Sequence, residues 1–153
     1  MDRNTKILIV DDEEIVRLGF SRTLKEVCCN VEEAASGSEA LRVMEGHPVD
    51  VVLLDLRMPG MDGMTVLKTI KERWPEIEVV VVTGYPSIVT AKEAVRLGAY
   101  NYLAKPVGPD EIYKAACGAI RQKEWTLHAD RTAQDKRNGS SAGSAAQAGR
   151  RPH

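Results

Sequence analysis

The sequence predicts an α/β fold, a doubly wound sheet of five parallel strands with helices on both faces. Three observations lead to this prediction. Short apolar runs alternate five times with amphipathic stretches that have the spacing of helices. Two of the runs, VVLL and VVVV, are apolar at consecutive positions, as in strands that are buried on both faces. The length of 153 residues fits one domain of ordinary size plus a tail.

The first half of the chain contains three of the predicted strands and two of the helices. The strands are Lys6–Val10, residues 31–35 and residues 49–54. Residues 14–28 form the first helix, with apolar residues at helical spacing on one face. The second helix runs to about residue 44 and begins with the motif SGSE. In this capping box, Ser36 and Glu39 satisfy each other's free N–H groups.

The second half contains the remaining elements. The strands are residues 78–82 and 100–104, and the helices are residues 64–74, 86–97 and 109–124. Pro75 ends the first of these helices, Gly98 ends the second, and Pro109 suits the first turn of the third. Since every strand is followed by a helix, right-handed crossovers and the flavodoxin-like strand order 2-1-3-4-5 are expected.

The chain is expected to divide into a folded domain, residues 1–124, and a disordered tail, residues 125–153. The tail is rich in Ser, Gly, Ala and Gln and has almost no large apolar residues. Such a segment cannot bury enough surface to offset the entropy lost on ordering.

Charge and composition exclude several classes of function. A formal net charge of −1 gives no electrostatic basis for binding nucleic acid or a membrane surface. No apolar run approaches the roughly 20 residues that span a bilayer. The start, MDRNTKILIV, lacks the long apolar stretch of a signal peptide. We therefore expect a cytoplasmic protein that by this chain alone binds neither nucleic acid nor a membrane.

Five polar residues follow the predicted strands. Asp11 and Asp12 come after the first strand and Asp55 after the third, while Thr83 and Lys105 follow the fourth and fifth. In a doubly wound sheet, ligands bind outside the carboxyl ends of the strands, where the strand order reverses. Three carboxylates, one hydroxyl and one cation are therefore expected to converge at one rim.

Each of these residues also has a simpler structural interpretation. Acidic residues after a strand can cap the next helix, a threonine fits any turn, and lysine is usually a solvated surface residue. Asp55 is harder to explain in this way, because it follows four consecutive apolar residues, where an unpaired charge is unfavourable. The convergence of all five residues favours a functional site.

The five residues predict a specific chemistry. Convergent carboxylates repel one another, and oxygen ligands in an open site favour Mg²⁺, which accepts one or two carboxylates together with a phosphate oxygen. A carboxylate can attack a phosphoryl group to give an acyl phosphate. A lysine and a hydroxyl can then bind the remaining phosphoryl oxygens.

Four motifs resemble those of a known family. They are ILIVDDEE after the first strand, VVLLDLRMPGMDG around Asp55, VVVVTGY at the fourth strand and GAYNYLAKP at the fifth. Over about residues 5–122 the chain resembles the receiver domains of two-component response regulators. It is most similar to receivers of nitrogen-regulation-type activators, but their ATPase and DNA-binding domains are absent from this sequence.

The resemblance implies a role for each acidic residue. Asp55 matches the phosphoacceptor, and Asp12 matches a direct Mg²⁺ ligand, with Asp11 close by and often bound through water. The backbone carbonyl of Arg57 matches a further metal ligand. The chain would then be a signalling switch that catalyses only its own phosphorylation and dephosphorylation, rather than a metabolic enzyme.

The resemblance also implies how the switch works. Thr83 and Lys105 match residues that bind phosphoryl oxygens, the Lys105–Pro106 peptide is expected to be cis, and Tyr102 matches an aromatic residue that moves inward with Thr83. Gly84 matches a small residue at the pocket mouth. The implied partners are a sensor histidine kinase or phosphotransfer protein and an unidentified downstream protein, with a homodimer as a further possibility.

Three alternatives are weighed against this interpretation. An aspartate-nucleophile phosphatase uses a similar set of residues, but its nucleophile ends the first strand rather than the third. A flavodoxin-type cofactor binder needs a phosphate loop after the first strand, where the acidic residues 11–14 would repel a phosphate. A receiver-like module that has lost phosphorylation would not need the complete set of five residues.

Overall fold

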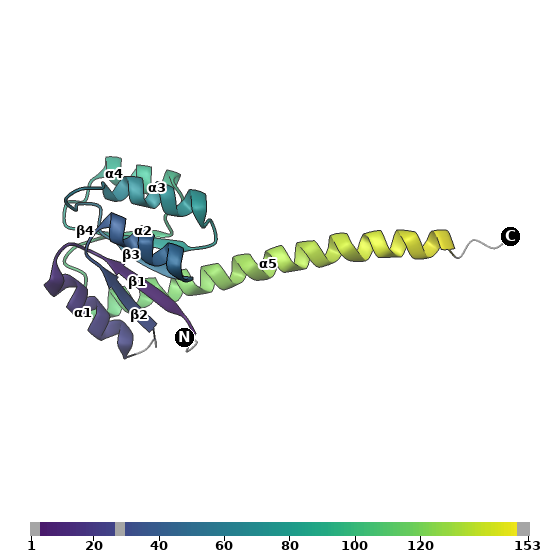
Figure 1. The fold of residues 1–153 in the computed structure, drawn as a ribbon, viewed down its shortest axis with the longest axis horizontal. Helices are drawn as coiled ribbons and strands as arrows, with labels where there is room; N and C mark the ends of the chain where they lie inside the picture. The colour runs from purple at the N-terminus through teal and green to yellow at the C-terminus, as the bar shows by residue number, and fades with distance from the viewer. Residues whose placement is uncertain (1–3, 27–29, 150–153) are drawn as a thin grey trace. The chain divides into compact units, whose positions relative to one another are not determined.

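The computed structural model describes residues 4–26 and 30–149, with side chains described through Gly139. Within these ranges, five strands alternate with five helices (Figure 1). The strands are β1 (Lys6–Val10), β2 (Asn30–Ala34), β3 (Val51–Leu54), β4 (Glu78–Thr83) and β5 (Asn101–Ala104). The helices are α1 (Glu14–Lys25), α2 (Gly37–Gly46), α3 (Gly63–Arg73), α4 (Ile88–Arg96) and α5 (Pro109–Gly149). All neighbouring strands pair in parallel, in the predicted order β2-β1-β3-β4-β5.

The hydrophobic core lies on both faces of the sheet. β3 and β4 are buried along their whole length, as their consecutive apolar residues predicted. On one face the strands pack against α2, α3 and α4 through residues such as Ala40, Val66 and Ala94. On the other face they pack against α1 and α5 through Leu24 and Ile112. The helices cover both faces of the sheet and leave its carboxyl edge open, and the candidate site lies at that edge.

Most element boundaries differ from the predicted ones by one to three residues. The first helix ends at Lys25, and the end predicted for it lies outside the described residues. The capping box is present in a modified form. Ser36 accepts a hydrogen bond from the Glu39 N–H at 3.2 Å, as predicted. The Glu39 carboxylate instead accepts from the Ala35 N–H at 2.9 Å, one residue before the expected donor.

The largest difference from the prediction is the length of α5. We expected this helix to end near residue 124 and disorder to follow from residue 125, but α5 continues to Gly149. The segment is rich in residues of high helix propensity, and no proline occurs between Pro109 and Pro152. A low content of apolar residues excludes a packed core, but it does not exclude a helix. No helix among the described residues, α5 included, is both long and apolar enough to cross a membrane.

The chain divides into two compact units, Met1–Lys123 and Glu124–His153, and the sheet lies in the first. In the second unit, residues 130–139 are all exposed. Local hydrogen bonds support the helix there, including one from Thr132 Oγ1 to the His128 carbonyl oxygen at 3.0 Å and one from Arg137 to Gln134 at 2.8 Å.

Deletion of residues 130–153 is expected to change the free energy of unfolding of the sheet-containing unit by less than about 0.5 kcal/mol. Residues 130–139 are exposed, and among the described residues the core clusters extend no further along the chain than Ile120. Urea unfolding followed by circular dichroism measures this change. A clearly larger loss would mean that the deleted segment contacts the first unit.

Candidate functional site

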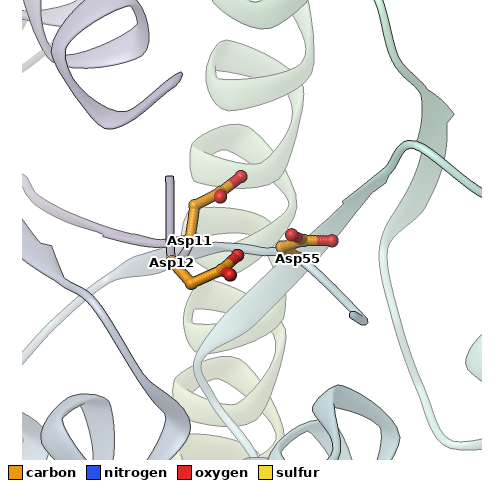
Figure 2. Close-up of side chains that lie close together, drawn as sticks. All are labelled: Asp11, Asp12 and Asp55. Carbon is orange, nitrogen blue, oxygen red and sulfur yellow. The ribbon is translucent and has the colours of Figure 1, made fainter. Parts of the chain in front are cut away.

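The site begins with three carboxylates at the carboxyl edge of the sheet. Asp11 and Asp12 follow β1, and Asp55 follows β3, the strand that pairs with β1. The Asp55 N–H donates to the Val10 carbonyl oxygen at 2.9 Å, which continues this pairing beyond the strand ends. Each residue offers a carboxylate oxygen, and these oxygens all lie within 4.8 Å of one another (Figure 2). The structure therefore brings together the three acids that the sequence placed at one rim.

The Asp55 carboxyl occupies a largely desolvated position. It is only 5% exposed, and Asp11 is buried as well, whereas Asp12 is exposed. Burial raises the pKa of the Asp55 carboxyl above its ordinary value. The Arg57 N–H and Lys105 act in the opposite direction, and the nearby Asp11 adds to the rise in pKa. Desolvation, more than repulsion between carboxylates, is thus the main cause of the raised pKa of Asp55.

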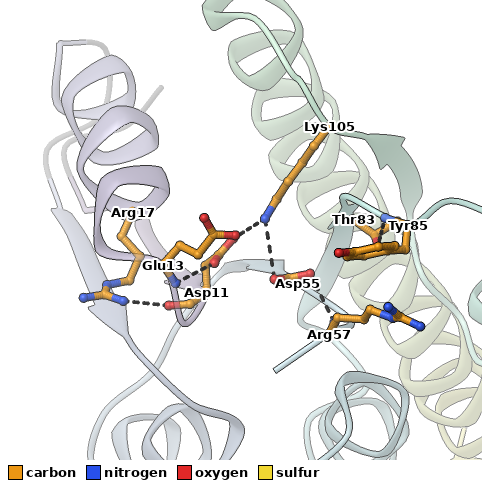
Figure 3. Close-up of polar contacts among 8 residues, drawn as sticks. All are labelled: Asp11, Glu13, Arg17, Asp55, Arg57, Thr83, Tyr85 and Lys105. Carbon is orange, nitrogen blue, oxygen red and sulfur yellow. Dashed lines mark hydrogen bonds and ion pairs between the residues drawn. The ribbon is translucent and has the colours of Figure 1, made fainter. Parts of the chain in front are cut away.

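Lys105 reaches the acidic cluster from the segment after β5. Its Nζ lies 2.7 Å from Asp11 Oδ2 and 3.5 Å from Asp55 Oδ2 (Figure 3). Burial alone would lower the pKa of Lys105, but the ion pairs with Asp11 and Asp55 outweigh it, so the pKa is raised. Lys105 is therefore a cation in this site. The peptide bond from Lys105 to Pro106 is cis, as the resemblance predicted.

Thr83, Tyr85 and Arg57 lie on the side of Asp55 away from Asp11 (Figure 3). The Arg57 N–H donates to Asp55 Oδ1 at 3.2 Å, and its guanidinium stacks on the Tyr85 ring at 4.1 Å from the centroid. Thr83 is buried at the end of β4, and its Oγ1 accepts from the Tyr85 N–H at 3.1 Å. Among the described contacts, no hydrogen bond joins Thr83 to Asp55.

Tyr102 connects β5 to the start of α4. Its hydroxyl accepts from the Ser87 N–H at 3.2 Å and lies 2.6 Å from Thr90 Oγ1. Ser87 is the N-cap of α4 and accepts from the Thr90 N–H at 3.0 Å. A movement of the Tyr102 ring would therefore alter the capping of α4.

Gly63, the last residue of the motif MPGMDG, permits the close approach of α3 to the end of β3. A Cβ atom at this position would lie 2.6 Å from the Asp55 carbonyl oxygen and 2.8 Å from the Leu56 carbonyl oxygen. Because both are backbone atoms of the segment that carries the buried acid, only glycine fits without displacing Asp55. The glycine at the end of this motif thus has a steric role, in addition to the chemical role of Asp55.

The oxygen atoms at this site suit a hard divalent cation. Asp11, Asp12 and Asp55 present a compact cluster of carboxylate oxygens, two of them from buried residues. Carboxylate oxygens with an open side toward solvent are the donors that Mg²⁺ takes in proteins, together with water and phosphate oxygens. The residues present therefore fit Mg²⁺.

Residues 7–117 match the response regulator receiver domain family. The chain belongs to this family. Over 126 residues it is 36% identical to an NtrX-like response regulator of Rickettsia bellii, which covers 79% of this chain and 26% of that protein. Over 112 residues it is 38% identical to sporulation initiation phosphotransferase F of Bacillus subtilis, which covers 73% of this chain and 90% of that protein. The receiver spans about a quarter of the length of the NtrX-like relatives.

Solved structures agree with this assignment. A CheY-like response regulator receiver domain protein from Methanospirillum hungatei aligns with a TM-score of 0.76 at 28% identity, over 80% of this chain and 98% of that one. NtrX from Brucella abortus aligns with a TM-score of 0.78 at 29% identity, over 83% of this chain and 29% of that one. The protein is thus a receiver of two-component signal transduction, with the fold and phosphorelay function of that family.

Two contacts of this receiver could not have been found from the sequence. Arg17 Nη1 donates to the Asp11 carbonyl oxygen at 2.7 Å, and Thr90 binds the Tyr102 hydroxyl. Neither residue lies in one of the four motifs or directly after a strand. Only the packing of α1 and α4 on the sheet places these side chains near the site, and no spacing in the sequence signals that.

Proposed function

We propose that the receiver takes a phosphoryl group onto the Asp55 carboxylate in a Mg²⁺-dependent reaction, and that the donor is a phosphohistidine of a sensor kinase or phosphotransfer protein. The observation that carries this proposal is the cluster itself. A buried aspartate lies beside two further acids and a lysine that contacts two of the three, which is the arrangement expected for binding a phosphoryl group together with a cation.

The transfer exchanges one bond for another. A carboxylate oxygen of Asp55 attacks phosphorus as the bond from phosphorus to the donor imidazole nitrogen breaks. When the second ring nitrogen of the donor carries a proton, the products are an acyl phosphate on Asp55 and a neutral imidazole, which keeps the electron pair of the broken bond. Because Asp55 is an anion when it attacks, it must be deprotonated, and the Arg57 N–H and Lys105 favour that form.

Mg²⁺, when bound, supplies charge neutralisation for the phosphoryl oxygens. Asp11, Asp12, Asp55 and the backbone carbonyl of Arg57 are the proposed ligands. Lys105 would exchange its contact with Asp11 for one with a phosphoryl oxygen, and Thr83 would donate its hydroxyl to another. The acyl phosphate gains these contacts with Lys105 and Thr83, which favours its formation. The receiver thus catalyses its own modification and no separate substrate reaction.

An apolar groove beside Lys105 suits the phosphodonor. Residues Ile15, Val16 and Phe20 of α1 line one wall, and Val107 and Ile112 lie on the other. Ile15 is 79% exposed, so a partner surface that covers this groove would bury apolar area next to the phosphoacceptor.

We propose that residues 1–124 form the switch and act in the cytoplasm on a downstream protein, with homodimerisation as a possible response. By this chain alone, the protein is proposed to bind neither nucleic acid nor a membrane.

Magnesium is expected to raise the melting temperature of the receiver. If its dissociation constant is about 1 mM, then about 10 mM Mg²⁺ stabilises the fold by roughly 1.4 kcal/mol, which corresponds to about 5 °C for a domain of this size. Differential scanning calorimetry at low ionic strength, with Mg²⁺ or with EDTA, measures the shift, because salt would screen the site. Equal melting temperatures in both buffers would contradict the proposed metal site.

In EDTA at neutral pH, Asp55→Asn is expected to melt above the parent. Because the pKa of Asp55 is raised in the folded state, its ionisation destabilises the fold at neutral pH. The penalty decreases as pH falls through the folded pKa and is absent below the unfolded value of about 3.9, so the advantage of the variant should shrink toward acidic pH. The exposed Asp62→Asn is the control. If the difference in melting temperature between Asp55→Asn and the parent were constant across this pH range, ionisation of Asp55 would not be what destabilises the fold.

A further inference from the structure

Arg17 of α1 contacts the backbone beside the acidic cluster without touching any of its carboxylates. Its Nη1 donates to the Asp11 carbonyl oxygen at 2.7 Å, and its Nε lies 3.4 Å from Glu33 Oε1 on β2 (Figure 3 shows the first contact). The Arg17 side chain is only 16% exposed. The guanidinium thus joins three elements: the helix that carries it, the edge strand β2 and the turn after β1.

The carbonyl that Arg17 binds belongs to the peptide between Asp11 and Asp12. Asp11 has further constraints, because its N–H donates to the Ala34 carbonyl oxygen at 3.1 Å and its Oδ1 accepts from the Glu13 N–H at 2.9 Å. Asp12 is exposed, and no described residue donates a hydrogen bond to its carboxylate. The orientation of this peptide plane is therefore one of the backbone features that set the direction of the Asp12 Cα–Cβ bond.

We propose that Arg17 is a positioning residue for Mg²⁺ binding, which holds the peptide between Asp11 and Asp12 so that the Asp12 carboxylate faces the metal. This inference rests on the proposed function and extends it to a residue outside the five that the sequence singled out. Arginine suits the role because its planar guanidinium donates to the carbonyl from one nitrogen while another nitrogen lies beside the Glu33 carboxylate as an ion pair. Residues that orient metal ligands typically change metal affinity by about 10–100-fold when they are replaced.

The direction of the change in Mg²⁺ affinity after removal of Arg17 distinguishes an electrostatic effect from a positioning effect. Removing a positive charge near three carboxylates makes the site more negative, so electrostatics alone would tighten the binding of a divalent cation. Loss of the positioning contact would weaken it. A role restricted to stabilising the fold would lower the melting temperature in EDTA but leave the affinity of the folded protein for Mg²⁺ unchanged or tighter.

The experiment is a Mg²⁺ titration followed by the backbone amide NMR shifts of residues 11–13 and 55–57, well below the melting temperature. Arg17→Met keeps most of the apolar stem, and its dissociation constant for Mg²⁺ is expected to rise about tenfold. Arg17→Lys keeps the charge but lacks the planar guanidinium that contacts the Asp11 carbonyl oxygen and Glu33 together. Its dissociation constant for Mg²⁺ should lie between those of Arg17→Met and the parent. The matched control is Arg22→Met, which removes an exposed arginine from the same helix and should bind Mg²⁺ like the parent.

A second readout separates affinity from chemistry. The rate of phosphoryl uptake from acetyl phosphate by Arg17→Met should be reduced at low Mg²⁺ and should approach the parent rate at saturating Mg²⁺. Unchanged or tighter Mg²⁺ binding by both Arg17 variants would overturn the inference while the proposed function stands, and if Arg17→Met does not fold, Arg17→Lys alone decides. Absence of a saturable Mg²⁺ response in the parent would instead refute the proposed metal site.

Discussion

Asp55→Asn is expected to reduce the incorporation of phosphoryl groups from acetyl phosphate to background, while the fold remains intact. The amide has nearly the shape of the carboxylate but is a far poorer nucleophile, and only the carboxylate can form the acyl phosphate. Asp55 is 5% exposed at the end of a fully buried strand, so a nearly isosteric replacement should leave the packing unchanged. Radiolabelled acetyl phosphate with Mg²⁺ measures the incorporation.

Asp62→Asn provides the matched control for this experiment. Asp62 is exposed at the N-cap of α3, and its side chain makes no capping hydrogen bond. The same chemical change at this position should leave incorporation at the level of the parent. Full labelling of Asp55→Asn would show that another residue accepts the phosphoryl group and would contradict the role of Asp55.

Lys105→Ala is expected to leave Mg²⁺ binding largely in place but to abolish the conformational response to phosphorylation. Lys105 is not a proposed metal ligand, and its Nζ contacts Asp11 and Asp55 in this structure. A switch requires contacts that differ between its two states, and the exchange of a carboxylate for a phosphoryl oxygen at Lys105 is such a difference. Without the lysine, the phosphoryl group loses its connection to β5.

The response can be followed at the start of α4. Ser87 and Thr90 bind the Tyr102 hydroxyl, so their amide NMR shifts should change when beryllofluoride, a phosphoryl analogue, binds the parent with Mg²⁺. In Lys105→Ala these shifts should stay near their unliganded values, while Lys114→Ala, which removes an exposed lysine from α5, should respond like the parent. A normal response in Lys105→Ala would refute its role in coupling.

Much of the fold could be predicted because the sheet is buried on both faces. The runs VVLL and VVVV contain no polar residue, whereas an amphipathic helix needs polar residues on its solvent-facing side. β3 and β4 could therefore be predicted directly from the sequence. Helix ends were less certain, since capping depends on local contacts such as that between Glu39 and the Ala35 N–H. The extension of α5 to Gly149 was missed because composition was used to predict disorder, although helix propensity needs no core.

The positions of the five polar residues that follow the strands could be predicted for a different reason. Parallel strands end at one edge, so residues that follow neighbouring strands must meet there, as Asp11, Asp12 and Asp55 do. The contacts of Arg17 and Thr90 could not be predicted in this way. They depend on how far each helix reaches along the sheet and on which backbone carbonyl or hydroxyl it meets, and these are properties of the packed structure alone.

The central claim is that Asp55 accepts the phosphoryl group, and mass spectrometry tests it most directly. The protein is incubated with acetyl phosphate and either Mg²⁺ or EDTA, and hydride reduction then converts any aspartyl phosphate to a stable homoserine before peptide mapping. With Mg²⁺ we predict a single phosphoryl adduct in the intact mass before reduction and homoserine at position 55 in the peptide map, and with EDTA almost none of either. An adduct located at any other residue, or no adduct in the presence of Mg²⁺, would contradict the claim.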